Sequence, residues 1–342
     1  MGGNFQTILG PMRKGCFAIA AVLIGVLVAV ALTSLAWRMV DKFSKPRVRK
    51  DLPLYKKSDL PGIKYEHIPG ARGEVAGIPV SINSLGFRGP EFTAEKAPGV
   101  VRIAVVGDSF IFGQGVKEEA SLPRLIETLL NQGSPGRYQV INAGTRGYNT
   151  LEEDIYLRAR VMPLKPEGVI LGITEVDDLD LQVFRPRNLG LEKAKQSFWW
   201  RLAPVRAVLA LRAQQEYLKD SKDYVRNLYD PGSETWKKFV ESLTDIRDQC
   251  RENHAWLLVI TFPLFEDGDS FAQERAQLHR QLTELGIDYV DPKPALSRYS
   301  WRELVISPKD MHPDTKAQKI FAGLIYDKLK SSAKLSPPQT PP

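Results

Sequence analysis

Ser109 is the strongest candidate for a reactive residue in this chain, because it ends the string Gly107-Asp108-Ser109 directly after the apolar run 101–106. A short run rich in β-branched residues that stops at a glycine predicts a buried strand that meets a turn. Open α/β sheets bind their ligands at the carboxyl ends of such strands. If Ser109 acts as a nucleophile, the protein is a hydrolase or an acyl transferase.

A serine hydroxyl needs a base, which is usually a histidine held by a carboxylate. His312 is the best candidate, because Asp310 lies two residues before it in a loop expected just ahead of the last helix. The same string is also typical of a helix N-terminal cap, with Asp314 as a second capping carboxylate. The remaining histidines, expected in a linker or on solvated helices, are His67, His254 and His279.

An ester hydrolase also needs donors for the oxyanion, usually backbone N–H groups. The string Asn142-Ala143-Gly144 follows the next expected strand, so the Gly144 N–H is a candidate beside Ser109. A strand-ending turn, with Gly147 as a second breaker, explains the same residues without any function.

The elements that position these residues alternate along the chain. Strands are expected at 101–106, 138–141, 168–173, 256–261 and 287–290, and helices at 122–131, 150–161, 271–285 and 314–330. Residues 77–83 are expected to form a hairpin or edge strands. Strands that alternate with helices predict βαβ units, a parallel sheet and helices on both faces.

Residues 16–37 carry no charge and are long enough to cross a bilayer as a helix. We expect an uncleaved single-pass anchor; the alternatives are a buried core helix and a signal peptide cleaved after Ser34-Leu35-Ala36. Positive charge is denser after this segment than before it, which favours a cytoplasmic domain. An N-terminal apolar segment before a hydrolase domain is the usual layout of an exported enzyme, so we expect an extracytoplasmic catalytic domain.

The expected organisation has five further parts around this anchor. They are an N-terminal flank at 1–15, a basic linker at 38–70, an α/β domain at 71–330, a helical insertion in it at about 180–254, and a disordered Pro-rich tail at 331–342. The insertion is expected to be a helical cap on the sheet or, alternatively, a lid that touches the membrane or gates the substrate.

These motifs together resemble the SGNH (GDSL-type) hydrolases, in their bacterial membrane-anchored form. The matching strings are Gly107-Asp108-Ser109-Phe110 with Phe112-Gly113-Gln114-Gly115, then residues 142–150, the lead-in at 83–91, and Asp310-Met311-His312-Pro313. The resemblance spans about residues 80–330. It implies a three-layer α/β/α, flavodoxin-like domain with a Ser109 nucleophile, a His312 base and Asp310 as its orienting acid. It also implies an oxyanion hole with the Ser109 and Gly144 N–H groups.

Two departures from the family pattern affect the expected chemistry. The third block normally supplies an asparagine to the oxyanion hole, whereas the aligned residue here is Asp177. An ionised carboxylate cannot donate a hydrogen bond. Asp177 is therefore protonated, or the hole uses backbone donors alone, or activity is reduced. The spacing Asp-x-His is one residue tighter than usual, and it also occurs in relatives that resemble bacterial polysaccharide O-acetyltransferases.

Composition narrows the function without naming it. The net charge is +7 and only Cys16 and Cys250 are present, so no disulfide framework or zinc site is expected. No cofactor, metal or nucleic-acid motif is apparent, and the acids Glu152-Glu153 are expected on a solvated helix face. The first hypothesis is a serine esterase acting on an ester-bearing small molecule, lipid or glycan. The others are an O-acyltransferase for an envelope glycan, and a non-catalytic binding or assembly protein on the same scaffold.

Overall fold

The computed structural model describes residues 54–175, 223–332 and 334–335, with short helical pieces between residues 21 and 35 and between 205 and 212. The chain divides into two units, of which the larger, Lys50–Val183 with Val225–Pro342, holds the sheet. Half of the expected anchor at 16–37, and the tail from residue 336, lie outside the described residues. Within the described ranges, no helix has both the length and the apolar character needed to span a bilayer.

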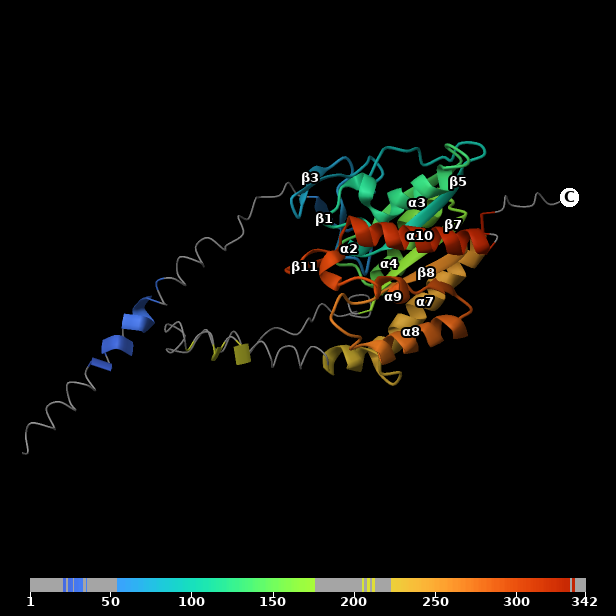
Figure 1. Ribbon diagram of the computed structural model, residues 1–342. Helices are drawn as coiled ribbons and strands as arrows, with labels where there is room; N and C mark the ends of the chain where they lie inside the picture. Colours follow the sequence, from blue (N-terminus) through green and yellow to red (C-terminus); the bar gives the residue numbers. More distant parts are fainter. Residues whose placement is uncertain are drawn as a thin grey trace, which may run out of the picture. The chain divides into compact units, whose positions relative to one another are not determined.

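The larger unit is built on a five-stranded sheet in which every neighbouring pair is parallel, as the sequence predicted (Figure 1). The strand order is β6-β5-β7-β8-β9, which is the flavodoxin-like order 2-1-3-4-5. The strands are β5 (Val101–Gly107), β6 (Tyr138–Gly144), β7 (Gly168–Thr174), β8 (Trp256–Phe262) and β9 (Asp288–Val290). The next strand in sequence is added on one side of β5 for β6 and on the other side for β7, β8 and β9. The strand order therefore switches between β5 and β7, and ligands of such sheets bind at that point.

Helices cover the sheet on both sides, so its central strands are almost entirely buried and mostly apolar. Helices α3 (Leu122–Asn131) and α10 (Thr315–Ser331) lie side by side (Figure 1), and their apolar side chains form one core cluster with alternate residues of β5, β7 and β8. Helices α4 (Thr150–Tyr156), α7 (Glu234–Glu252) and α8 (Ala272–Glu284) complete the second helical layer.

Helix α7 lies in the region expected to be an insertion, but it is the crossover between β7 and β8. Its buried residues include Trp236, Phe239 and Leu243, so it covers the sheet. A parallel strand pair needs such a crossover, and a helix usually supplies it. The expected insertion at 180–254 therefore ends before α7, and its part before residue 205 lies outside the described residues.

The acids at the start of α4 differ from the expectation of a solvated face. Glu152 forms a capping box with Asn149, whose Oδ1 accepts from the Glu152 N–H at 3.1 Å. Glu153 is fully buried, and neither of its carboxyl oxygens has a hydrogen-bond partner within the described part of the chain. Burial therefore raises the pKa of Glu153 well above its usual value, and the neighbouring Asp108 adds to this effect.

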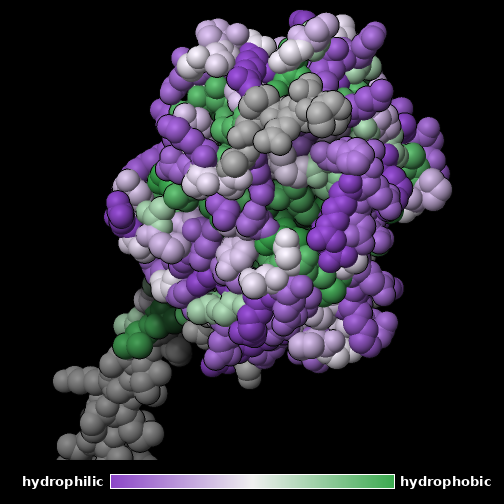
Figure 2. Space-filling model, turned by 90° about the vertical axis from the view of Figure 1, so that its right-hand side faces the viewer, coloured by the Kyte–Doolittle hydropathy of each residue, from purple (hydrophilic) through white to green (hydrophobic). Residues whose placement is uncertain are grey.

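Two antiparallel hairpins precede the sheet: β1 (Tyr55–Lys57) with β2 (Tyr65–His67), and β3 (Arg72–Val75) with β4 (Ile78–Ser81). Leu54, Val80 and Phe112 belong to the small core that these hairpins share with helix α2 (Ser109–Phe112). The described part of the larger unit thus begins at Leu54, inside the segment expected as a linker at 38–70, and the apolar residues there contact partners that are distant in the sequence. Figure 2 shows one face of the molecule, on which hydrophilic residues predominate around a smaller hydrophobic area.

The remaining elements are short and lie mostly near strand ends. They are α2 (Ser109–Phe112), α9 (Lys293–Leu296), the strands β10 (Val305–Ser307) and β11 (Asp310–Pro313), a π-helical turn at Leu157–Val161, and the 3₁₀ turns Glu118–Ala120, Met162–Leu164 and Trp301–Glu303.

Candidate active site

Ser109 is the first residue of α2, immediately beyond the end of β5. The Asp108 side chain caps this helix, since its Oδ1 accepts from the Phe110 N–H at 2.8 Å. Its other oxygen accepts from the Thr174 hydroxyl at 3.1 Å, which ties the turn to β7. Asp108 and Ser109 are both buried, so the turn is held within the sheet edge and does not extend into solvent.

Arg88 fixes the loop that follows α2. Its guanidinium donates to the carbonyl oxygens of Phe112, Gly113 and Val116 at 2.6, 2.6 and 2.7 Å. Burial lowers the pKa of Arg88 to about 10, which still leaves it charged at neutral pH. Charged donors form the stronger hydrogen bonds, so this one side chain holds most of the loop backbone. The sequence contained this arginine in its lead-in string, without any sign of what it would contact.

Asp310 and His312 lie on β11, where the sequence predicted a loop. Residues two apart on a strand project from the same face, so the tight Asp-x-His spacing brings the two side chains together. His312 Nδ1 lies 2.5 Å from Asp310 Oδ1, and His312 Nε2 lies 2.8 Å from Ser109 Oγ. The helix-capping role suggested for this string belongs to Asp314, which accepts from the Ala317 N–H and begins α10.

The surroundings favour an ionised Asp310. Burial opposes ionisation, but the hydrogen bond and the charge of His312 outweigh it, so the pKa of Asp310 is lowered overall. An ionised Asp310 accepts the proton on Nδ1 and leaves Nε2 free to accept from Ser109. The Phe110 ring packs beside the imidazole at 5.6 Å between centroids. In this arrangement His312 Nε2 can take the proton of the Ser109 hydroxyl as the serine oxygen attacks a carbonyl carbon.

Gly144 stands close to the nucleophile turn, but its N–H donates to Asn142 Oδ1 at 3.1 Å. A Cβ at Gly144 would lie 2.2 Å from the Phe112 nitrogen, so this glycine is needed for close packing against α2. The Gly147 N–H, in contrast, has no recorded acceptor among the described residues. Gly147 follows Arg146, whose Nε contacts Gln114 of the nucleophile loop, so the Gly147 N–H is a second candidate donor beside that of Gly144; it stood as a second glycine in the same sequence block. Asp177 lies outside the described residues.

The other histidines lie away from Ser109. His67 is buried on β2 against Phe112, and burial lowers its pKa to about 4. His254 is exposed in the turn after α7, and His279 of α8 contacts the Thr261 hydroxyl at 2.9 Å. No group of three or more His, Cys, Asp or Glu residues in the described ranges is placed to hold a metal ion.

Gln114 adjoins the histidine and Arg146 contacts Gln114, and sequence reasoning gave neither residue a role. Gln114 Nε2 lies 2.9 Å from His312 Nδ1 and 3.4 Å from Asp310 Oδ2. Gln114 Oε1 accepts from Arg146 Nε at 2.6 Å. Both residues stood within the quoted sequence blocks, where their spacing alone did not reveal that they meet.

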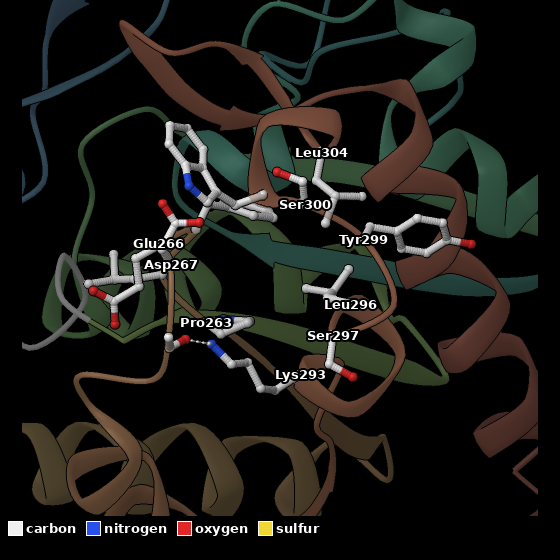
Figure 3. Close-up of a pocket in the computed structure, with 13 residues that line it drawn as sticks. Pro263, Glu266, Asp267, Lys293, Leu296, Ser297, Tyr299, Ser300 and Leu304 are labelled. Carbon is white, nitrogen blue, oxygen red and sulfur yellow. Dashed lines mark hydrogen bonds between the residues drawn. The ribbon is translucent and has the colours of Figure 1, made fainter.

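A hollow of about 240 Å³ lies between the loop after β8 and the segment after β9 (Figure 3). Its lining mixes polar and apolar side chains, and Figure 3 shows Glu266 on one side of it and Leu296 on the other. Phe265, also in the lining, packs on Phe110, which also contacts Phe262 and His312. The Phe110 ring therefore lies between this hollow and the histidine.

No protein-family model and no curated protein sequence matches the chain. Among solved structures, it is similar to a two-domain esterase active on acetylated mannans, co-crystallised with mannopentaose, at 16% identity over 71% of this chain and 52% of that one, with a TM-score of 0.44. This chain thus spans about half the length of that esterase.

Two other similar structures are covered almost completely. A protein of the G-D-S-L family from Desulfitobacterium hafniense DCB-2 shows 17% identity over 66% of this chain and 98% of that one, with a TM-score of 0.41. An acetylxylan esterase from Geobacillus stearothermophilus, crystallised as a catalytic mutant, shows 12% identity over 69% and 96%, with a TM-score of 0.42. At these identities the likeness says nothing about individual residues, so the chemistry depends on the geometry described above.

Proposed function

We propose that this protein is a serine esterase of the SGNH type that cleaves carboxylic esters, O-acetyl esters among them, through an acyl-enzyme at Ser109. The observation that carries the proposal is the unbroken contact from Ser109 Oγ to His312 Nε2 and from His312 Nδ1 to Asp310 Oδ1. Ser109 of α2 and His312 of β11 are 203 residues apart in the sequence, yet the three side chains meet at the carboxyl edge of a parallel sheet. Ligands of open α/β sheets bind at this edge.

In the first half of the proposed reaction, Ser109 Oγ attacks the carbonyl carbon of the ester while its proton passes to His312 Nε2. Asp310 stabilises the imidazolium that forms and keeps the ring in the required tautomer. The tetrahedral intermediate then collapses, and the C–O bond to the leaving alcohol breaks. The alcohol takes the proton from His312 Nε2, and the acyl group remains as an ester on Ser109.

In the second half, water attacks the acyl carbon and gives one proton to His312. Collapse releases the carboxylic acid and returns that proton to Ser109 Oγ. The oxyanion of each intermediate needs donors. We assign this role to the N–H groups of Ser109 and Gly147. Ser109 is suited to it because the first N–H groups of a helix have no acceptor within the helix.

A fluorophosphonate probe tests the proposal on the full-length protein in detergent. We expect labelling of the wild type and none of the Ser109→Ala variant, with matching loss of hydrolysis of p-nitrophenyl acetate. Ser121→Ala is the matched control, since Ser121 is a buried serine at the start of α3. Labelling that persists in Ser109→Ala, or equal absence of labelling and hydrolysis in both proteins, would contradict the esterase and favour a binding protein on this scaffold.

The same acyl-enzyme can be resolved by a sugar hydroxyl in place of water. An acetylated acceptor oligosaccharide, formed in the same assay when a glycan is added, would identify an O-acyltransferase. Free acetate in unchanged yield with the acceptor present would identify the hydrolase.

We also propose that residues 16–37 anchor the protein in a membrane, with the catalytic domain on the extracytoplasmic side. The segment carries no charge, and its described large residues, such as Val22, Ile24 and Leu32, are more than half exposed. A bilayer would cover such side chains. A reporter enzyme fused after residue 330 that is active only in the exported compartment supports this orientation, and activity only in the cytoplasm overturns it.

A further inference from the structure

Gln114 lies where three segments of the chain meet: two loops and the strand β11. It belongs to the loop after α2, whereas Arg146 belongs to the loop after β6, and Asp310 and His312 belong to β11. The Gln114 oxygen accepts from Arg146 Nε at 2.6 Å. The Gln114 nitrogen lies 3.4 Å from Asp310 Oδ2 and 2.9 Å from His312 Nδ1. A single amide therefore connects the nucleophile loop, the loop that ends in Gly147, and the acid–base pair.

Arg146 determines which way this amide faces. A guanidinium only donates hydrogen bonds, so the partner of Arg146 Nε must be the Gln114 oxygen. The Gln114 NH₂ group is then turned toward Asp310 and His312. Without Arg146, the oxygen and nitrogen of the amide could exchange places, which would put an acceptor beside the Asp310 carboxylate.

The proton on His312 Nδ1 then has one suitable acceptor. Asp310 Oδ1 is the nearer atom, at 2.5 Å, and a hydrogen bond to an ionised carboxylate is stronger than one to a neutral group. The Gln114 NH₂ group is left to donate to Asp310 Oδ2. With His312 on one oxygen and Gln114 on the other, the Asp310 carboxylate is held in the plane that the imidazole requires.

Such support matters because the acid–base pair lies on an irregular two-stranded hairpin. The register of β10 with β11 shifts between Val305 and Ser307, and the side chains of Asp310 and His312 are each 25% exposed. The loop that carries Gln114 is, by contrast, held by Arg88 through three carbonyl groups. Gln114 thus extends from a fixed loop to a less constrained one.

The residues on both sides of Gln114 fit it to this place. Gly113 and Gly115 have φ values of +83° and +76°, which side-chain-bearing residues rarely adopt. A Cβ at Gly115 would lie 2.8 Å from Cγ1 of Ile306 on β10, so the loop presses directly against the hairpin. This backbone course leaves the Gln114 side chain between the two.

We propose that Gln114, oriented by Arg146, is a positioning residue that holds the Asp310–His312 pair in register with Ser109. Its effect on turnover rests on the proposed esterase function; its effect on the imidazole does not. Neither residue touches the reacting atoms, and both act through Asp310 and His312.

Four variants of the full-length protein test the inference: Gln114→Ala, Gln114→Glu, Arg146→Ala and Arg146→Lys. Since a misplacement of about 1 Å can cost on the order of 100-fold in rate, we expect Gln114→Ala and Arg146→Ala to lower kcat by roughly that factor, with KM little changed. Arg146→Lys should recover part of the loss, because an ammonium group still donates to the Gln114 oxygen. In Gln114→Glu, the new carboxylate favours the protonated imidazole, so the acid limb of the pH–rate profile should move to higher pH.

The imidazole ¹⁵N spectrum of His312 gives a second measurement that needs no turnover. We expect the Nδ1–H tautomer to predominate in the wild type. In Gln114→Ala its population should fall and that of the Nε2–H tautomer should rise. The exposed residues Gln132 and Arg298 provide matched control variants, each changed to alanine, which should behave as wild type.

The outcomes separate the two proposals. Wild-type rates, pH profiles and tautomer in Gln114→Ala and Arg146→Ala would overturn the positioning role while the esterase stands. If the wild type shows no Ser109-dependent labelling or hydrolysis, the esterase fails. A changed His312 tautomer in Gln114→Ala would still support the positioning role, and an unchanged one would overturn it.

Discussion

The nucleophile side and the base side of the site are built in different ways. Ser109 stands on a turn fixed by buried backbone and side-chain contacts: Asp108 caps it, Gly144 packs against it, and Arg88 holds the loop beyond it. His312 stands on a two-stranded hairpin, partly exposed, and meets the rest of the site through a few side-chain contacts. Figure 1 shows α2 and β11 at the same end of the larger unit.

This difference indicates where changes should affect stability and where they should affect activity. Contacts around α2 also hold together the sheet edge and the hairpins before it, so their loss should unfold the protein more easily. Contacts around β11 serve mainly to orient two side chains, so their loss should slow the reaction and leave the fold intact. The following predictions test this contrast, from the largest expected effect to the smallest.

His312→Ala should remove nearly all activity, because among the described residues only His312 contacts the Ser109 hydroxyl in a position to take its proton. Loss of a nucleophile or base in a serine triad costs on the order of 10⁶-fold in kcat, so we expect a loss of about 10⁵- to 10⁶-fold in ester hydrolysis. The melting temperature should stay within about 2 °C of wild type, since the side chain that is removed is partly exposed and lies on a short hairpin. A large fall in melting temperature would mean that the base side is as much a part of the structural core as the nucleophile side.

Arg88→Met should have the opposite profile. Three buried carbonyl groups lose a charged donor. The Phe112 and Gly113 oxygens keep longer bonds from Asn142 Nδ2 and the Val116 N–H, both at 3.3 Å, and a hydrogen bond to a charged group contributes about 1.5–3 kcal/mol. We expect a loss of roughly 4 kcal/mol in the free energy of unfolding, measured by urea denaturation. Arg298→Met, at an exposed position, is the control and should change stability by less than about 0.5 kcal/mol. Equal stability of the two variants would contradict the claim that Arg88 stabilises the loop after α2.

His67, which packs against Phe112 on the nucleophile side, should make the stability of the folded protein decrease at acid pH. Burial lowers its pKa to about 4 from an ordinary value of 6.5, so the unfolded chain binds a proton between these values and the folded protein does not. The stability present above pH 6.5 is therefore lost as the pH falls toward 4, and the full loss is roughly 3 kcal/mol.

Urea unfolding of wild type and His67→Phe between pH 4 and 7 measures this effect. The ring of phenylalanine suits the aromatic surroundings of His67 but does not titrate. We expect a shallower fall of stability with decreasing pH in the variant. Parallel pH dependences of the two proteins would show that His67 does not contribute.

Gly144→Ala tests the close approach of β6 to α2. The new Cβ would lie 2.2 Å from the Phe112 nitrogen, and backbone cannot move aside as a flexible side chain can. Overpacking of this kind costs about 1–3 kcal/mol, and we expect about 2 kcal/mol by urea denaturation. Gly133→Ala, where nothing lies within 4 Å of the new Cβ, is the matched control. If Gly144→Ala changed kcat with no change in stability, the oxyanion role first expected for Gly144 would be restored.

Much of the fold could be predicted from periodic patterns. The five sheet strands and the helices at 122–131 and 314–330 were predicted within a few residues, because buried strands and amphipathic helices impose their periods on the local sequence. The hairpin at Tyr55–His67 was missed, since three-residue strands carry too little pattern to distinguish them from a linker. Helix α7 was assigned to an insertion because its charged face masked the buried side.

The site divides in the same way. Ser109, Asp310 and His312 could be selected in advance, because their residue types and local spacing limit the chemistry that they can perform. Gln114, Arg146 and Arg88 could not, because each acts through partners from 24 to nearly 200 residues away. Gly147 could be considered as an oxyanion donor only once the structure showed that the Gly144 N–H already donates to Asn142.

By itself, the sequence determined that a serine would end a buried strand and that an acid would stand two residues before a histidine. Both facts follow from short-range patterns along one segment of chain. Only the tertiary structure decided that these segments meet, that β11 is a strand with both side chains on one face, and that one glutamine amide ties three loops together. Such contacts depend on how the parallel sheet aligns its carboxyl ends, which brings distant segments within hydrogen-bonding distance.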